Sequence, residues 1–478
     1  MLTFLQINFC LPCETHTLTI PIPTHTSSGR TTLGIARAAG LASPSHALLL
    51  GELRRAFEAL PDSRRPSNAT KFEMIDAALS AFSVFFTQSP SFLDWQIRME
   101  QVQGRNNAIS IFGVHQIPSD GQIRNLLDPV PPVILSPVMT RIGDILFEQG
   151  HFGAFRSIGA TFLVAFDGTD FFSSKTVSCP CCTNIKQKDG SIQHRHIALT
   201  PVMLAPGQES VIALPPEFVT PQDGHDKQDC ELAAASRWLA QHGAHYAARG
   251  LTILGDDLYC HQPFCQQVLA TKAHFILTCK PSSHTTLYEW VEDLQRMGKI
   301  SSHTVSRRVE TKQFTDTYRF VSELPLRNSD DALLVNWCEI VTTNGNDEIT
   351  YQNAWATSHS ITGNNVAQVV EAGRSRWKIE NENNNTLKTK GYHFEHNFGH
   401  GQKNLSNLFA TMILLAFLLH TALDLLDLRY RAVRAALPSR RTFFEHIRAL
   451  LLYLPFDNWD HLMTFMLAKL KPEPANTG

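Results

Sequence analysis

Hydrophobic and polar residues follow two different periods along the chain, and the change falls near residue 160. From residue 46 to residue 155, apolar positions recur every three or four residues, as in "HALLLGELRRAFEAL" and "FEMIDAALSAFSVFFTQ". That spacing predicts amphipathic helices. In "PSDGQIRNLLDPV", Ser119 or Asp120 stands where a helix N-cap is expected. We therefore expect an all-helical N-terminal domain over residues 46–155, a candidate for DNA binding.

After Thr161, short continuous apolar runs replace the helical period. The runs that predict strands are "FLVAFDG", "RHIALTPVML", "ESVIALPPEFV", "GLTILGDD" and "AHFILTCKP". Helices are expected from "QPFCQQVLATK" and from "KQDCELAAASRWLAQHG", which carries a helix-ending glycine at Gly243. This order predicts an α/β fold with a mixed sheet and flanking helices, whose first part spans residues 156–281.

The remaining segments differ in texture from this core. Residues 282–348 contain strand-like stretches such as "TDTYRFVSEL" and predict a strand-rich insertion, after which the core resumes over residues 349–428. Residues 429–478 predict a basic helical tail. Residues 1–45 are rich in Thr, Ser, Pro and His without periodicity, which predicts a disordered or loosely ordered extension.

One apolar stretch is long enough to raise the question of a membrane. "LFATMILLAFLLHTALDLLDL" begins at Leu408, but His420, Asp424 and Asp427 interrupt its continuation. A buried core helix is therefore expected. The first residues lack a basic region and a cleavage site, and the ten cysteines are scattered, which favours a reducing, cytoplasmic setting.

The formal net charge of −2 excludes a global positive field around the protein. A polyanion would have to be bound by local basic patches. Lys and Arg outnumber Asp and Glu between Arg374 and Arg448. Solvated helix faces explain such an excess as well as DNA binding does.

Two aspartates follow strands that are otherwise hydrophobic. Asp167 ends "FLVAFD", and Asp256, with Asp257 as its rival, ends "GLTILGD". A carboxylate at such a position is costly to desolvate unless it is paired or bound to a cation. Two of them at matching strand ends predict one shared site, although each Asp alone could simply cap the following turn.

A third carboxylate comes from "RSRWKIENENNN". Arg376 and Glu380 are four residues apart, so both project from one face of a helix, about 6 Å apart. Glu382 lies about 200° further around the helix and cannot address the same site. Two Asp and one Glu offer hard oxygen ligands, which suit two Mg²⁺ or Mn²⁺ ions acting on a phosphodiester.

This set of residues resembles the catalytic centre of DDE transposases with a ribonuclease H-like domain. The similarity is to the insertion-sequence-four-like group, whose last acidic residue lies in a Tyr-Arg-Glu-Lys signature. It rests on "AFDGTD", "LTILGDDLY" and "RWKIEN", with "KQDCELAAASRWL" and "GYHFEHNFGHGQKNL" beside them, over residues 77–425. The resemblance implies that Asp167, Asp256 and Glu380 are catalytic metal ligands and that Arg376 and Lys388 bind DNA phosphates.

The chain departs from that signature at two positions. Gly373 stands where the tyrosine is expected, and Leu387 stands where the lysine is expected. Lys388 is one residue late and would point about 80° away from Glu380 on a regular helix. Residues 383–385, three asparagines, favour a local bulge that would return Lys388 to the face of Glu380.

A second metal site is suggested by "CPCCTNIKQKDGSIQHRH". Cys179, Cys182, His194 and His196 could bind a structural Zn²⁺, with Cys181 as an alternative ligand. On a strand the two histidines would share a face. Reduced thiols near unrelated histidines are the competing interpretation.

The function that follows from the resemblance is DNA transposition by a bacterial insertion sequence. Its partners would be double-stranded DNA, namely the element's terminal repeats and the target, and a second copy of the chain during synapsis. The protein would be cytoplasmic and associated with the nucleoid. The alternatives are an inactive or domesticated transposase-derived DNA-binding protein and a metal-dependent nuclease of the same fold. A two-carboxylate glycosidase would leave the third carboxylate without a role.

Overall fold

The computed structural model describes residues 4–7, 18–21, 45–65, 71–221 and 229–470. Residues 43–470 form one unit, and the two chain ends belong to another. Most of the predicted extension over residues 1–45 lies outside the described residues. Within it, strands β1 (Phe4–Ile7) and β2 (Leu18–Pro21) pair in antiparallel fashion.

The first part of the large unit is helical. Ser119 caps one of these helices as expected, because its hydroxyl accepts a hydrogen bond from the backbone of Gln122 and the Gln122 side chain accepts one in return. The helices are α1 (Ser45–Glu58), α2 (Met74–Phe86), α3 (Phe92–Met99), α4 (Val102–Phe112), α5 (Asp120–Leu127) and α6 (Ser136–Glu148).

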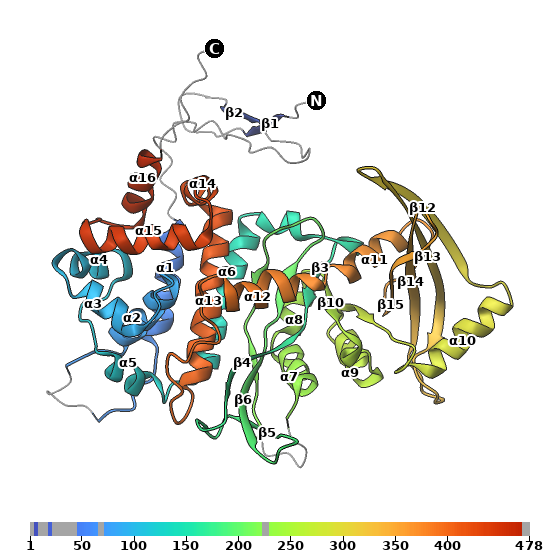
Figure 1. Cartoon of the computed structure of the whole chain (residues 1–478), viewed down its shortest axis with the longest axis horizontal. Coiled ribbons are helices and arrows are strands. Elements are labelled where there is room, and N and C mark those ends of the chain that lie inside the picture. Colours follow the sequence, from blue (N-terminus) through green and yellow to red (C-terminus); the bar gives the residue numbers. More distant parts are fainter. Residues whose placement is uncertain (1–3, 8–17, 22–44, 66–70, 222–228, 471–478) are drawn as a thin grey trace. The chain divides into compact units, whose positions relative to one another are not determined.

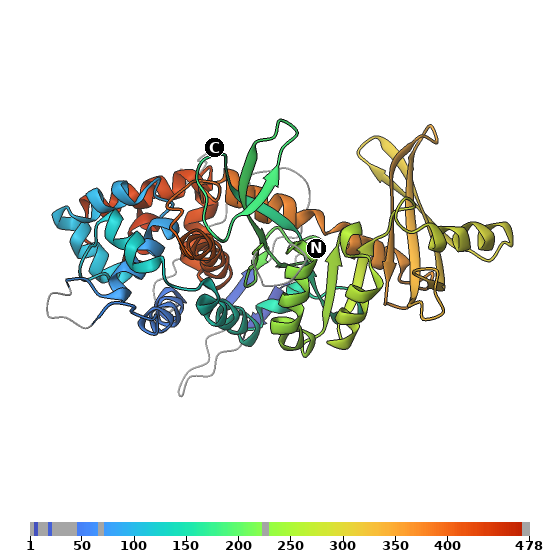
Figure 2. The same cartoon turned by 90° about the horizontal axis from the view of Figure 1, so that it is seen from below.

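Helix α13 (Leu405–Leu426) is the apolar stretch that raised the question of a membrane. Its length and composition would suffice to cross one, but 89% of its most apolar window is buried inside the protein. It contacts α1, α2, α5 and α6 on one side and strand β8 (Ile212–Ala213) on another. Figures 1 and 2 both show α13 between the N-terminal helices and the strands. The expected core helix is thus confirmed.

Nine strands of the described chain form one mixed sheet, so the α/β class with flanking helices is confirmed. At its centre, β3 (Phe162–Ala165), β10 (Leu251–Gly255) and β11 (His274–Thr278) run parallel. Strand β7 (Val202–Leu204) pairs antiparallel with β3, and β8 pairs antiparallel with β7 at the edge of the sheet. Helices α9 (Gln262–Ala270) and α11 (Val366–Arg374) pack against β11.

Two runs that predict single strands are each divided between two sheets. "RHIALTPVML" forms β6 (Ile192–Leu199) and β7, and "ESVIALPPEFV" forms β8 and β9 (Glu217–Val219). The breaks fall at Pro201 and at residues 215–216, two prolines, which cannot donate a ladder hydrogen bond. Strand β6 pairs with β4 (Gly168–Ser174), β5 (Thr183–Lys186) and β9 in a separate small sheet.

The helix predicted to end at Gly243 continues beyond it. It comprises α7 (Glu231–Trp238), a π-helical turn over Leu239–Gly243 and α8 (Ala244–Ala247). Gly250, with φ +86°, follows the true end. A Cβ at Gly243 would lie 2.9 Å from Cγ2 of Thr271, so this glycine permits close packing and does not terminate the helix.

The segment predicted as a strand-rich insertion begins with a helix that the sequence pattern did not suggest, α10 (Thr285–Arg296). Its strands are β12 (Ser301–Val309), β13 (Lys312–Pro325) and β14 (Leu334–Asn344). They extend the main sheet through β15 (Ile349–Thr357), which follows the predicted insertion and pairs with both β14 and β11.

After α11 the chain forms a π-helical segment over Ile379–Asn384 and then α12 (Asn385–Thr389). A loop leads from α12 to α13. The chain then continues as α14 (Leu428–Ala436), α15 (Arg440–Tyr453) and α16 (Trp459–Lys469), which agrees with the helices expected beyond residue 429. Residues 471–478 of that predicted tail lie outside the described part.

Candidate active site and a separate cysteine and histidine cluster

Asp167 and Asp256 follow two neighbouring parallel strands. In the register of β3 and β10, Ala165 is opposite Leu254, and the Phe166 amide donates a hydrogen bond to the Leu254 carbonyl over 2.9 Å. Each aspartate comes two residues after one member of that pair. The sheet therefore brings both carboxylates to the same edge, as expected for strands that end together.

Asp167 is surrounded by other acidic side chains. Its pKa is raised to about 7, mainly by burial and also by the charges of Glu231, Glu380 and Asp256, while the nearby Arg376 guanidinium opposes the rise. Like charges that approach one another disfavour the ionised form unless a cation balances them. A cation-binding position is what this electrostatic arrangement favours.

Asn384 orients Asp167, a role that the sequence did not reveal. Its side-chain amide donates from Nδ2 to Oδ2 of Asp167 over 2.9 Å, and its Oδ1 accepts from the Thr200 hydroxyl over 2.9 Å. Asn384 is only 7% exposed. The segment after Glu380 is thus attached to the end of β3.

Glu231 is a fourth carboxylate of the site, and it too was missed. Its Oε1 accepts from the Gly168 amide over 2.9 Å and from the Tyr259 hydroxyl. A Cβ at Gly168 would lie 2.3 Å from Oε2 of Glu231, so a larger residue at position 168 would displace this carboxylate. The only signal was the phrase "KQDCELAAASRWL", which resembles transposases but has no assigned role in the sequence.

Glu380 lies in the π-helical segment, one turn from Arg376. Arg376 Nη2 donates to Oε1 of Glu380 over 2.7 Å, so the expected pair is present, and the Glu380 side chain is 53% exposed. The oxygens of Asp167, Asp256 and Glu380 are not among the groups of described residues whose ligand atoms all lie within 4.8 Å of one another. Glu380 therefore lies near the aspartates, but the three side chains are not close enough together in this structure to share one ion.

The π-helical segment lies where the asparagines favour a bulge. A π-helical turn contains one more residue than an α-helical turn. The side chain of Lys388 therefore lies within about 20° of that of Glu380 around the helix axis, instead of about 80°. The Lys388 ammonium, however, forms an ion pair with Oε1 of Glu395 over 2.9 Å. Contact of Lys388 with DNA stays a prediction.

The missing signature tyrosine has a packing explanation. A Cβ at Gly373 would lie 2.7 Å from Nε1 of Trp355, on β15, and 2.9 Å from Cε2 of the same indole. Trp355 is 1% exposed. The indole is buried in the core and occupies the space that a larger residue at position 373 would need.

Asp257, the rival of Asp256, has other partners. Its Oδ1 accepts from the Lys280 amide over 2.7 Å, its Oδ2 accepts from the Ser283 hydroxyl, and His284 lies 3.4 Å away. Asp256 Oδ1 accepts from the Leu258 amide over 2.9 Å, so this carboxylate also caps the following turn, as the simpler interpretation expects. The geometry favours Asp256 for the site.

A second cluster joins Cys179, Cys182, His196 and His400, whose ligand atoms all lie within 4.8 Å of one another. It is a group that could hold a metal, as expected, but the fourth member is His400 and not His194. The His194 ring instead contacts Asn184, with Nδ1 and Oδ1 2.6 Å apart.

The strand register explains this correction. Thr183 pairs with Arg195, so Cys182 lies opposite His196, while His194 is opposite Asn184, nearer the hairpin tip. The His194 ring is held by Asn184 and does not belong to the group. Cys181, the alternative ligand, donates to the Lys403 carbonyl over 3.2 Å and is not in the group.

Several basic side chains of the C-terminal part form hydrogen bonds within the protein. Arg448 donates to the carbonyls of Thr87 and Gln88, at 2.9 and 2.7 Å, and Arg431 donates to the carbonyls of Asp424 and Leu425, at 2.7 and 2.8 Å. Such contacts neutralise helix C-termini. These two arginines therefore stabilise the helical part and are poor candidates for DNA contacts.

The chain matches no known protein family model, and a search of curated proteins finds no match for it.

Proposed function

We propose that the chain is a DNA transposase of the insertion-sequence-four-like group, which cuts the ends of a mobile element and joins them to target DNA. The observation that carries the proposal is the meeting of Asp167 and Asp256 at the ends of β3 and β10, with the segment of Glu380 attached to Asp167 through Asn384. The three acidic residues are far apart in the sequence, and joint binding of metal ions would explain why the fold brings their segments together.

The sheet supports a ribonuclease H-like catalytic domain. Its centre is mixed, with the parallel strands β3, β10 and β11 and an antiparallel partner, β7, for β3. Strands β12 to β15 enter between Asp256 and Glu380 and extend this sheet, which is the position of the inserted strands in the resemblance. Helix α11 brings the chain back across β11 toward the π-helical segment that holds Glu380.

The donor set fits divalent cations. Asp167, Asp256 and Glu380 offer hard carboxylate oxygens, and Asp167 lies in a concentration of negative charge that favours a cation. These residues would hold two Mg²⁺ or Mn²⁺ ions, which supply the Lewis acidity for cleavage of a phosphodiester. Cysteine and histidine, which favour zinc, lie in the other cluster.

Binding of DNA would complete the metal site by breaking the Arg376–Glu380 ion pair. Glu380 is half exposed and held by Arg376 in the present structure. A DNA phosphate would compete for the guanidinium, because phosphate and carboxylate accept the same donor fork. Glu380 would then be released to approach Asp167 and Asp256. Lys388, on the same side of the helix, would exchange Glu395 for phosphate in the same way.

A second candidate is a transposase-derived DNA-binding protein that no longer cuts. Gly373 in place of the signature tyrosine and the Lys388–Glu395 ion pair favour it. A nuclease that cuts without joining is the third. The first proposal includes three further expectations. The protein would bind double-stranded DNA, two protomers would pair on the two ends of the element, and the protein would be associated with the nucleoid.

The test is a joining assay with the DNA that flanks the gene on each side, a supercoiled plasmid as target, and Mg²⁺. A transposase releases 3′ ends and joins them to the plasmid, a nuclease yields cut ends only, and a DNA-binding protein yields neither. Glu380→Ala should abolish both products. The matched control is Glu382→Ala, since Glu382 belongs to the same π-helical segment and has no part in the proposed site.

A further inference from the structure

The cysteine and histidine cluster has the dimensions of a tetrahedral site. The sulfurs of Cys179 and Cys182 are 3.8 Å apart. His196 Nε2 lies 3.4 Å from each sulfur, and His400 Nε2 lies 3.5 Å from that of Cys182. Bonds to zinc of about 2.3 Å from sulfur and about 2.0 Å from nitrogen would give edges of about 3.8 Å and 3.5 Å in a tetrahedron.

The surroundings hold the ligands in these positions. Cys182, His196 and His400 are 1%, 2% and 8% exposed. The Cys179 amide donates to the Cys182 sulfur over 3.4 Å, an interaction that favours a thiolate. The other ring nitrogen of His196, Nδ1, is 3.0 Å from the side-chain oxygen of Asn407 on α13. A metal-binding histidine commonly donates to such a partner, which fixes its tautomer.

We propose that Cys179, Cys182, His196 and His400 bind a structural zinc ion. Two sulfurs and two imidazole nitrogens form a donor set that zinc prefers over Mg²⁺ or Ca²⁺. All four positions of the tetrahedron are taken by protein atoms, which leaves none for substrate or water. The site is therefore structural, and it is independent of the carboxylates proposed to act on DNA.

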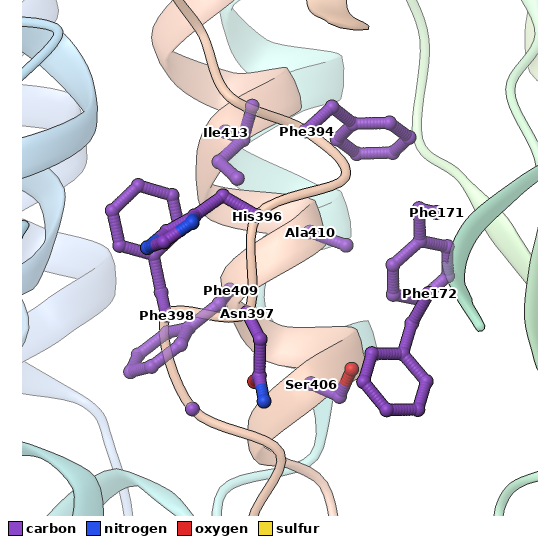
Figure 3. Close-up of a pocket in the computed structure, with 11 residues that line it drawn as sticks. Phe171, Phe172, Phe394, His396, Asn397, Phe398, Ser406, Phe409, Ala410 and Ile413 are labelled. Carbon is purple, nitrogen blue, oxygen red and sulfur yellow. The ribbon is translucent and has the colours of Figure 1, made fainter. Parts of the chain in front are cut away.

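The zinc ion would join parts of the chain that are distant in sequence. Cys182 and His400 are 218 residues apart. One lies at the start of β5, and the other lies in the loop between α12 and α13. Their neighbours continue the contact, because the Phe172 ring of β4 packs on the His400 ring with centroids 4.4 Å apart. Figure 3 shows Phe171 and Phe172 facing this loop and α13 across a pocket.

The link would extend to the candidate active site. Strand β6, which carries His196, pairs through Leu199 with Gly168, the residue after Asp167. Thr200, just beyond β6, donates to Asn384, the residue that orients Asp167. The zinc ion would fix the middle of β6 at His196, while the carboxylate site lies near its last residue, Leu199.

The test is the zinc content of the full-length chain, purified without a histidine tag and measured by mass spectrometry of the metal. We expect one zinc ion per chain in the unaltered protein. Cys182→Ser and His400→Ala should lose it. His194→Ala and Cys181→Ser, which alter neighbours outside the group, should keep it. Loss of zinc from His194→Ala with retention in His400→Ala would overturn the ligand set.

X-ray absorption at the zinc edge of the unaltered protein decides the matter even where a variant fails to fold. The expected first shell contains two sulfurs at about 2.3 Å and two nitrogens at about 2.0 Å. A shell of oxygen and nitrogen only would overturn the proposal. So would purified protein without zinc, or a Cys179–Cys182 disulfide found by mass spectrometry of the alkylated chain.

Discussion

Asn384 donates a hydrogen bond to Asp167 over 2.9 Å, although 217 positions separate the two residues. This bond attaches the π-helical segment of Glu380 to the end of the central strand β3. It also fixes one oxygen of the Asp167 carboxylate, whose neighbours Glu231, Glu380 and Asp256 are all acidic. The candidate site is therefore assembled by a neutral amide as well as by its acidic residues.

Replacing Asn384 should be costly. Asn384→Ala removes the amide from Asp167 and leaves the buried Thr200 hydroxyl without its acceptor. A buried polar group that loses its partner costs about 1–3 kcal/mol, and we expect the free energy of unfolding in urea to fall by about that amount. Asn385→Ala, at the exposed next position, is the control and should change it by less than about 0.5 kcal/mol. Equal losses in the two variants would contradict the role of Asn384.

Gly373 and Trp355 should be coupled. Gly373→Ala places a methyl group 2.7 Å from the indole nitrogen and should cost about 1–3 kcal/mol by overpacking. The same change in a Trp355→Phe background should cost less, because the smaller ring frees the space. Gly363→Ala, at a position with no atom within 4 Å of the new Cβ, is the matched control. Additive free energies in this double-mutant cycle would show that the two residues do not interact.

The sequence revealed those parts of the site that follow from local pattern. Asp167 and Asp256 come directly after apolar strands, and the spacing of Arg376 and Glu380 places them on one helical turn. Asn384 and Glu231 were missed because their roles depend on contacts across the sheet, which no local spacing records. His400 was missed for the same reason. The H-x-H spacing in β6 suggested His194, whereas the strand register and a distant loop supply the fourth ligand.

The fold was predictable to a similar extent. Helical periodicity located α1, α2 and α5, and apolar runs located the central parallel strands. The positions of the strand breaks at Pro201 and of the true helix end at Gly250 were not recognised. Helix α10 was missed although Leu287, Val291 and Leu294 recur at helical spacing, a pattern that predicts an amphipathic helix. The strand-like stretches that follow it led to a strand-rich prediction for the whole segment.

The free energy of unfolding should decrease as the pH is lowered, because His46 is buried in its neutral form. Burial lowers the pKa of His46 to about 3, and its ring stacks on Trp459 with centroids 4.8 Å apart. The unfolded chain binds a proton on this residue below pH about 6.5, whereas the folded protein does not. The contribution is therefore fully present above pH 6.5 and is lost as pH falls.

The measurement for His46 compares unfolding free energies between pH 6 and pH 4.5. We expect His46→Phe, which keeps the ring stack, to flatten the decline by about 1.4 kcal/mol per pH unit relative to the unaltered chain. Parallel curves for the two proteins would show that His46 is protonated in the folded state.

The partner of His196 should affect the proposed zinc site. Asn407→Ala removes the acceptor from Nδ1 of the ring, and loss of such a partner weakens metal binding by about 10- to 100-fold. Competition with a chromogenic chelator measures this change directly. Ser406→Ala, one residue earlier on α13, should leave the affinity unchanged. Equal affinity in the unaltered protein and Asn407→Ala would mean that Asn407 does not support the ligand.

The most direct test of the central claim is whether Asp167, Asp256 and Glu380 act as one site. It measures the rate of Mg²⁺-dependent cleavage of the flanking DNA by Asp167→Asn, Asp256→Asn, Glu380→Gln and the triple variant. Groups that act as a unit are not additive, so each single change should lower the rate by about 10³-fold or more and the triple variant should be no worse. Cleavage at the unaltered rate by any one of the single variants would contradict the account.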